Sequence, residues 1–119
     1  MFEYRARCVN VVDGDTQDVV VDLGFRIERQ IRLRLLGVDT HETYGVSHGS
    51  EEYQRGLAET EYVAQWFGTA ESEWDGEWPL KIQTEKRGKY GRYLATIARR
   101  CDGAELTADL LAEFDDIEN

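Results

Sequence analysis

The stretch VVDGDTQDVVVDLG, residues 11–24, places Asp-Gly-Asp between two runs of β-branched residues. Valine-rich runs are typical of β-strands, and Asp and Gly are typical of the turn that joins two strands. The stretch therefore predicts two strands of one sheet with a turn at Asp13, Gly14 and Asp15. Because a sheet interior does not tolerate unpaired charge, two carboxylates at this turn need either solvent or a partner.

An EF-hand calcium loop would explain the two acids, but the sequence excludes it. Such a loop needs a third acid followed by glycine, and Gln17 and Asp18 stand at those two positions. Gly24 stands where the closing glutamate belongs. The turn is therefore either a plain hairpin turn or one part of a site whose other residues come from elsewhere in the chain.

Hydrophobic periodicity predicts five strands and two helices. The strands are expected at 3–12, 17–23, 27–37, 79–87 and 92–100. One helix is expected at 51–67, followed by a loop at 68–78, and a second helix begins at the N-cap Thr107 and ends at Phe114. This order predicts an α+β protein that is mainly β, a five-stranded OB-fold barrel. The loops of such barrels commonly bind nucleic acids.

The 119 residues, of which 41% are hydrophobic, suit one compact domain spanning 1–119. The sequence contains no run of about 18 apolar residues, and its first residues lack the apolar segment of a signal peptide. We therefore expect no membrane contact and a cytoplasmic location. The source stays open, with a phage or a salt-adapted host as alternatives; the excess of Arg over Lys, 11 to 3, together with the acidic predicted helices, points weakly to salt adaptation.

The net charge of −10 argues against a polyanionic partner, but the charges are unevenly distributed. Residues 25–36 carry four Arg and one Glu, for a net charge of +3, and residues 79–101 carry seven basic residues and one Glu, for +6. Residues 51–77 and 102–119 each have a net charge of −7. Since the predicted strands are basic and the predicted helices acidic, the molecule can present one basic face to a nucleic acid.

A second acidic cluster follows the third predicted strand, where Arg34 precedes Asp39 and Glu42. A further arginine, Arg92, begins the fifth predicted strand after the basic turn at 87–91. Two acids can share a cation, one acid can act as a base, and two arginines can hold a phosphate. Together these residues form a set suited to phosphodiester cleavage.

Three motifs in this order resemble those of the staphylococcal nuclease (thermonuclease) family. They are VVDGDT (11–16), RLRLLGVDTHE (32–42) and KRGKYGRYLATI (86–97). The resemblance extends from residue 4 to about residue 113. It implies the OB-fold barrel and calcium-dependent cleavage of DNA and RNA.

The resemblance implies a metal site. Asp15 and Asp39 correspond to the calcium-binding carboxylates, Thr40 to the residue that supplies a backbone carbonyl, and Asp13 to an acid close to the metal. Calcium accepts oxygen ligands in flexible geometry, so two carboxylates, a carbonyl and waters suffice. Calcium is the expected cofactor, with Mg²⁺ or Mn²⁺ as alternatives.

The resemblance also implies the residues that act on the substrate. Glu42 corresponds to the residue that polarises the attacking water, either as a base or by holding the water near the metal. Arg34 and Arg92 correspond to the pair that grips the scissile phosphate, since the planar fork of Arg matches phosphate oxygens. Lys89 and Tyr90 correspond to residues that contact the neighbouring terminal phosphate.

Two departures from the family pattern affect these expectations. His41 stands where the family usually has proline, so the loop that carries Thr40 and Glu42 is expected to be less rigid. The chain ends at Asn119, before the substrate-stacking aromatic residues and the third helix with which the family normally continues. The resemblance therefore implies a truncated C-terminal helical part.

The last predicted helix carries more apolar surface than one side needs, through Leu106, Leu110, Leu111 and Phe114. A small domain rarely leaves a large apolar patch exposed. We therefore expect a homodimer through this helix, unless the tryptophans at positions 66, 74 and 78 cover it.

Two other functions remain open. The chain could be a non-catalytic OB-fold module that binds nucleic acid or protein, or a small subunit that buries its truncated end in a partner. The metal-binding acids, Glu42 and both arginines are all present, and a binding module has no need of them. The sequence therefore predicts a metal-dependent nuclease acting on DNA, RNA or both.

Overall fold

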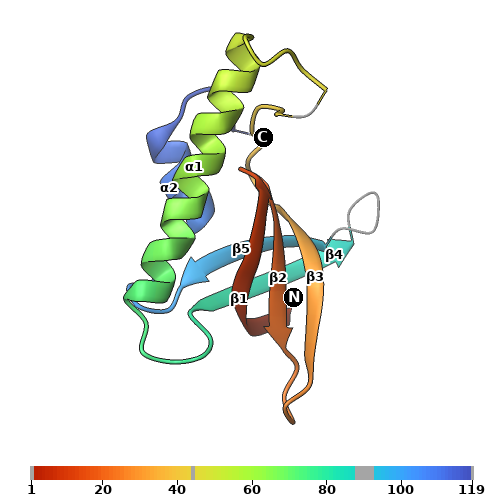
Figure 1. Cartoon of the computed structure of the whole chain (residues 1–119). Helices are drawn as coiled ribbons and strands as arrows, with labels where there is room; N and C mark the ends of the chain where they lie inside the picture. The colour runs from red at the N-terminus through yellow and green to blue at the C-terminus, as the bar shows by residue number, and fades with distance from the viewer. Residues whose placement is uncertain (1, 44, 88–92, 119) are drawn as a thin grey trace.

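The computed structural model describes residues 2–43, 45–87 and 93–118. Their elements occur in the order β1 (Phe2–Asp13), β2 (Thr16–Asp22), β3 (Glu28–Leu35), α1 (Glu51–Ser72), β4 (Leu80–Arg87), β5 (Tyr93–Arg99) and α2 (Leu106–Glu113). The strands form a closed barrel in the order β1-β2-β3-β5-β4, and the two helices lie together on one side of it (Figure 1). This α+β architecture confirms the predicted five-stranded barrel and is consistent with an OB-like fold.

The barrel closes through pairs of different direction. β1, β2 and β3 pair as an antiparallel meander, and β4 pairs antiparallel with both β1 and β5. β3 and β5 pair in parallel, from Leu33 opposite Tyr93 to Leu35 opposite Ala95. Alternate residues of every strand fill the interior, as the sequence pattern predicts. The almost fully buried members are Ala6, Val19, Val21, Leu33, Leu35, Leu80, Ile82, Ala95 and Ile97.

Helix α1 begins after the N-cap Ser50, whose side chain accepts a hydrogen bond from the Tyr53 N–H. It continues to Ser72, five residues beyond its predicted end at residue 67. The buried face of the helix continues to Ala70, which packs into the core, so the extra turn is stabilised by tertiary contacts. The predicted loop at 68–78 is therefore wrong for its first five residues.

Helix α2 begins differently from the prediction. Its N-cap is Glu105, whose side chain makes no capping hydrogen bond. Thr107 lies inside the first turn, and its hydroxyl donates to the Leu36 carbonyl oxygen at 3.0 Å. The prediction of Thr107 as the N-cap is wrong because this hydroxyl binds the loop after β3 instead of the start of its own helix.

The apolar side of α2 is covered by its own chain. Leu106 and Leu110 are fully buried. Trp66 of α1 packs in the same core, and its Nε1–H donates to Asp109 of α2 at 2.8 Å. Ile117, three residues after the helix C-cap, is also buried in this core. The leucines therefore give no reason for a dimer, and the homodimer stays a prediction.

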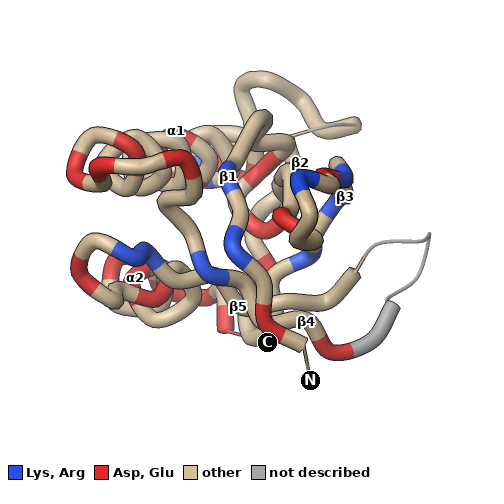
Figure 2. Tube along the Cα trace, turned by 90° about the horizontal axis from the view of Figure 1, so that it is seen from below, with Lys and Arg blue, Asp and Glu red and all other residues tan. Residues whose placement is uncertain are grey.

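Charge follows the elements as the sequence predicts. Figure 2 shows Lys and Arg residues along β1 and β3, and Asp and Glu residues prominent on α1 and α2. Several strand arginines are paired with acids of neighbouring strands, including Arg5 with Asp22 and Arg32 with Asp18. In the described part of the chain, neither helix has the length and apolar character needed to cross a bilayer.

The segment after α2 holds the loop that follows β3. The Asp39 N–H donates to the Ile117 carbonyl oxygen at 2.8 Å, and Val38 forms a β-bridge with Glu118. The Ile117 side chain is 1% exposed and belongs to the core.

Replacing Ile117 by Ala should therefore lower the free energy of unfolding by about 2–5 kcal/mol, because the substitution leaves a cavity in the core. Denaturant unfolding followed by circular dichroism measures the change. The control is Glu118→Ala, which truncates an exposed neighbour and should change stability by less than about 0.5 kcal/mol. An Ile117→Ala chain as stable as the parent would show that this segment does not close the core.

Candidate functional site

The turn between β1 and β2 brings Asp13 and Asp15 to one end of the barrel. A register shift between Val11 and Asp13 marks a bulge at this end of β1. Asp15 is only 6% exposed. Its Oδ1 accepts a hydrogen bond from the Thr16 hydroxyl at 3.0 Å, and its Oδ2 accepts one from the Thr40 N–H, also at 3.0 Å. The charge of this buried carboxylate is therefore partly compensated by the chain itself.

Arg34, near the end of β3, connects Asp15 to the loop that follows. Its Nη1 lies 3.1 Å from Asp15 Oδ2 and donates to the carbonyl oxygens of Val38 at 2.8 Å and Leu35 at 3.2 Å. Its Nη2 donates to Asp39 Oδ1 at 3.2 Å. A guanidinium has five N–H groups. Judged by the contacts of the described residues, the Nε–H and one Nη2–H remain available to a ligand.

Two glycines, Gly14 and Gly56, pack closely against the loop that carries Asp39, Thr40 and Glu42. A Cβ added at Gly14 would lie 2.6 Å from Thr40 Cγ2, and one added at Gly56 of α1 would lie 2.7 Å from the His41 carbonyl oxygen. Both distances are too short for a real side chain, so only glycine fits without displacement of the loop.

A residue that the sequence did not indicate holds the same loop. Glu59 of α1 is 1% exposed. Its Oε1 accepts from the His41 N–H at 2.7 Å, and its Oε2 lies 2.9 Å from the His41 Nδ1. These two contacts replace the rigidity that a proline at position 41 would supply. One signal was present, since Glu59 shares the helical spacing of Gly56 and Val63 on the buried face of α1.

The acids of the turn influence each other strongly. Burial, the neighbouring Asp15 carboxyl and, to a smaller extent, the charge of Glu42 together raise the pKa of Asp13 to about 7. Burial opposes the ionisation of Asp15, but hydrogen bonds from Asp13 and the Thr40 N–H, together with Arg34, hold the pKa of Asp15 below its usual value. Asp15 is thus ionised, and Asp13 is the carboxyl of the pair that holds a proton below about pH 7.

The donor chemistry of this site suits calcium. Asp13, Asp15 and Asp39 offer carboxylates, and the buried Thr40 hydroxyl has no hydrogen-bond partner among the described residues. The Asp, Glu, His and Cys side chains of the described residues do not form a group of three at metal-binding distances. Arg34 contacts both Asp15 and Asp39 instead. A calcium ion shared by these two acids would need backbone and water oxygens as further ligands.

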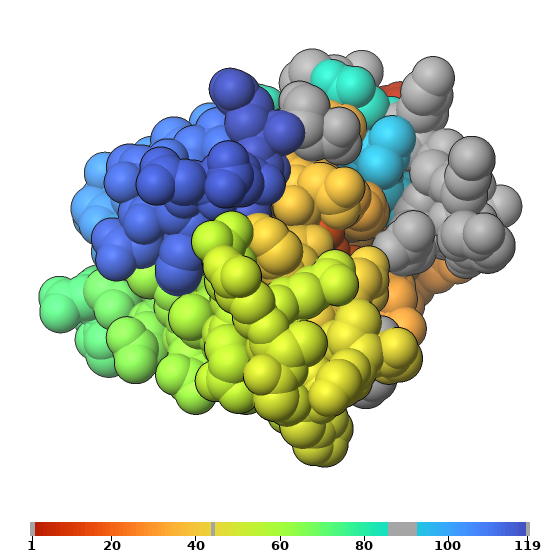
Figure 3. Space-filling view, turned by 90° about the horizontal axis from the view of Figure 1, so that it is seen from above, coloured from red at the N-terminus to blue at the C-terminus, as the bar shows by residue number. Residues whose placement is uncertain are grey.

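Four of the predicted site residues are joined by direct contacts, namely Asp15, Arg34, Asp39 and Thr40. Glu42 is exposed and lies close enough to Asp13 to influence its pKa. Figure 3 shows this loop as the gold surface between the blue C-terminal part and the yellow-green atoms at the start of α1. The remaining predicted residues, Lys89, Tyr90 and Arg92, lie outside the described residues.

No protein-family model matches this chain, and a search of curated proteins finds no match to it either. The family resemblance therefore stays a prediction that depends on three short motifs and on the residues they contain.

The raised pKa of Asp13 gives the stability a pH dependence of defined sign. The folded state keeps the proton up to about pH 7, whereas the unfolded chain releases it near 3.8, so stability falls through this group as the pH rises from about 4 to 7. Asp13→Asn removes the titration and keeps an acceptor for the Asp15 N–H. It should raise the melting temperature over the parent most at pH 8 and least at pH 4.

Thermal unfolding across this pH range measures the difference. The control is Asp75→Asn, which changes an exposed acid in the loop before β4 and should shift the melting temperature by a small amount at every pH. A stabilisation by Asp13→Asn that is the same at pH 4 and pH 8 would contradict the assigned titration.

The loop contact of Glu59 predicts a second effect on stability. Glu59→Leu should lower the free energy of unfolding by about 1–3 kcal/mol, because the His41 N–H loses its buried acceptor. Glu59→Gln keeps an acceptor at this position and should lose less. The control is Glu61→Leu, an exposed position on the same helix. Equal losses for Glu59→Leu and Glu61→Leu in denaturant unfolding would show that the contact contributes nothing.

Proposed function

We propose that this chain is a calcium-dependent nuclease that hydrolyses phosphodiester bonds of DNA or RNA, as its resemblance to the staphylococcal nuclease family implies. The observation that carries the proposal is the contact network of Asp15, Arg34 and Asp39. These residues come from the first two of the three family motifs. Their meeting at one end of the barrel supports a shared role.

The roles follow from the chemistry of each side chain. Arg34 keeps an Nε–H and one Nη2–H beyond its contacts with described residues, and a guanidinium edge of this kind binds two phosphate oxygens at once. The exposed Glu42 can accept a proton from the attacking water. Calcium, when bound, would neutralise the crowded acids and polarise a phosphate oxygen. The phosphate-binding roles proposed for Arg92, Lys89 and Tyr90 rest on the family resemblance alone.

A non-catalytic OB-like binding module is the second candidate. It is favoured by the internal contacts of Arg34, which hold the Val38 and Leu35 carbonyl oxygens and so stabilise the loop after β3. An arginine with this structural role would be retained even without catalysis. The two candidates differ in Glu42, because its exposed side chain contributes little to the fold.

Cleavage of single-stranded DNA tests the proposal. The parent chain should cleave in calcium and stop when a chelator is added. Glu42→Gln should lower turnover by about 10²-fold or more, because the water loses its proton acceptor, and should leave the melting temperature unchanged. The control is Glu52→Gln, an exposed acid in the first turn of α1, which should retain full turnover.

Equal cleavage in calcium and in chelator would exclude a metal-dependent reaction. Strand binding without cleavage, in parent and Glu42→Gln alike, would favour the binding module. Arg34→Lys should also lower turnover, since lysine cannot form the bidentate contact with phosphate. Its stability has to be measured in parallel, because Arg34 also holds the loop.

A further inference from the structure

The turn between β2 and β3 lies at the opposite end of β3 from Arg34 and has an unusual backbone. Gly24, Phe25 and Arg26 all have φ in the left-handed region, at 84°, 53° and 61°. The turn is closed by two hydrogen bonds, from the Leu23 N–H to the Ile27 carbonyl oxygen and from the Ile27 N–H to the Gly24 carbonyl oxygen, both at 2.8 Å. Non-glycine residues in this conformation are strained, and such strain is concentrated at binding sites.

This strained turn presents an aromatic side chain to solvent. Phe25 is 98% exposed, whereas the flanking Leu23 and Ile27 are 44% and 55% exposed. Packing within the barrel therefore does not explain why Phe25 occupies this position. An exposed aromatic ring on a strained turn is instead suited to contact a partner.

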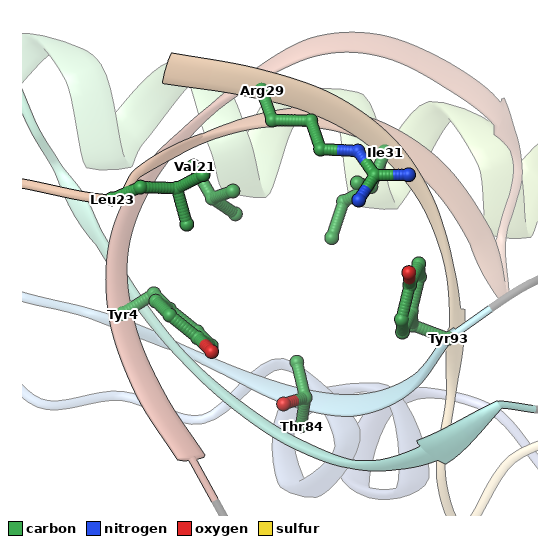
Figure 4. A pocket seen from close by; sticks show the side chains of 7 residues that line it. All are labelled: Tyr4, Val21, Leu23, Arg29, Ile31, Thr84 and Tyr93. Atoms are coloured by element: carbon green, nitrogen blue, oxygen red, sulfur yellow. The ribbon is translucent and has the colours of Figure 1, made fainter. Parts of the chain in front are cut away.

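Residues of the turn line two hollows of different character. The inner hollow, of about 120 Å³, lies at the open end of the barrel, and Figure 4 shows Leu23 and Arg29 among the side chains around it. The outer hollow, of about 550 Å³, lies between Phe25 and Arg26 of the turn and Glu77 and Trp78 of the loop before β4. Phe25 thus faces a space large enough for a nucleotide.

Most charged side chains that line the outer hollow form ion pairs with one another or with β1. Asp22 pairs with Arg5 at 2.8 Å and Glu28 pairs with Arg7 at 3.3 Å, so both acids are neutralised by β1. Arg26 forms no ion pair with the described residues and stands beside Phe25. Glu77 belongs to the other wall of the hollow. The turn itself therefore offers one aromatic face and one uncompensated cation.

We propose that Phe25, Arg26 and the outer hollow bind one nucleotide of a single-stranded nucleic acid. The base stacks on Phe25 and its phosphate contacts Arg26. An aromatic ring beside a positive charge is the usual platform for an unpaired base, and any base can use it because each has a π-face. A lipid surface fits less well, because the exposed apolar side chains of the turn are only Phe25 and the partly exposed Leu23 and Ile27, too little apolar surface for stable membrane binding.

The position of the turn agrees with this role. The choice of a nucleic acid as the ligand rests on the proposed nuclease function, and the inference adds a second contact site for that substrate. β3 leads from Arg34 to the turn, and nine residues of extended chain span at most about 30 Å. A stacked strand advances about 3.4 Å per nucleotide, so roughly nine nucleotides cover that distance. A strand of 12 nucleotides held at Arg34 can therefore reach Phe25.

Binding of a fluorescent 12-nucleotide single-stranded DNA, measured by anisotropy in calcium, tests the inference. Glu42→Gln serves as the parent chain, so that cleavage does not interfere. Phe25→Ala should raise the Kd by about 5- to 100-fold, whereas Phe25→Tyr should retain binding because it keeps the ring. The matched control is Phe2→Ala, which removes another exposed Phe, at the start of β1, and should leave the Kd unchanged.

Several outcomes would overturn the inference. They are an unchanged Kd for Phe25→Ala, full binding by Phe25→Leu, and a parent chain that binds phosphatidylserine vesicles but not the DNA. A change of oligomeric state on Phe25→Ala would assign the turn to a protein contact instead. The nuclease proposal fails separately: metal-dependent cleavage can be absent while DNA binding still depends on Phe25, and cleavage can be present while Phe25 has no effect on binding.

Discussion

The arrangement of this end of the barrel depends on one buried carboxylate. Asp15 is ionised away from solvent, and an ion in that position must be compensated by several partners. Its partners come from the turn itself, from β3 and from the loop after β3. Because they belong to different segments, satisfying one charge fixes the relative positions of all three. The close approach of Gly14 to Thr40 and the Glu59 contact with His41 complete this fixation from either side.

The sequence predicted most of the barrel from two local signals. Core-facing and outward-facing residues alternate in strands such as β3, and β2, which is buried along nearly its whole length, is rich in β-branched valine. Prediction from the sequence failed where contacts between distant parts of the chain determine the local structure. Helix α1 continues past residue 67 because Ala70 packs into the core. Thr107 lies inside α2 because its hydroxyl donates a hydrogen bond to the Leu36 carbonyl oxygen. Glu59 was missed for a related reason: a charged residue on a helix is usually solvated, and its partner His41 is 18 residues away. Of the site, Asp15, Arg34, Asp39 and Thr40 were found because short motifs contain them.

The contacts of Arg34 are compatible both with a structural role and with the catalytic role proposed for it. It neutralises Asp15 and Asp39 and also holds two backbone carbonyl oxygens, which is the behaviour of a structural residue. It also keeps N–H groups beyond those contacts at an end of the barrel crowded with acids. A catalytic residue that is already fixed by its neighbours needs little reorganisation when a substrate arrives. Structural and catalytic use of this side chain are therefore compatible, and the energetic demands of Asp15 explain why the arginine is held so firmly.

The parallel pairing of β3 with β5 has a consequence for how the molecule folds. Leu33 and Tyr93 become neighbours only after the 59 residues between them have been brought back to the barrel, and the entropy of closing so long a loop is lost before the contact can compensate for it. The meander of β1, β2 and β3 can form early from local contacts, but both of its outer edges stay unpaired until β4 and β5 arrive. During synthesis, which proceeds from the N-terminus, those edges are open to other chains. Barrel closure is therefore the step at which this protein is most exposed to misassembly.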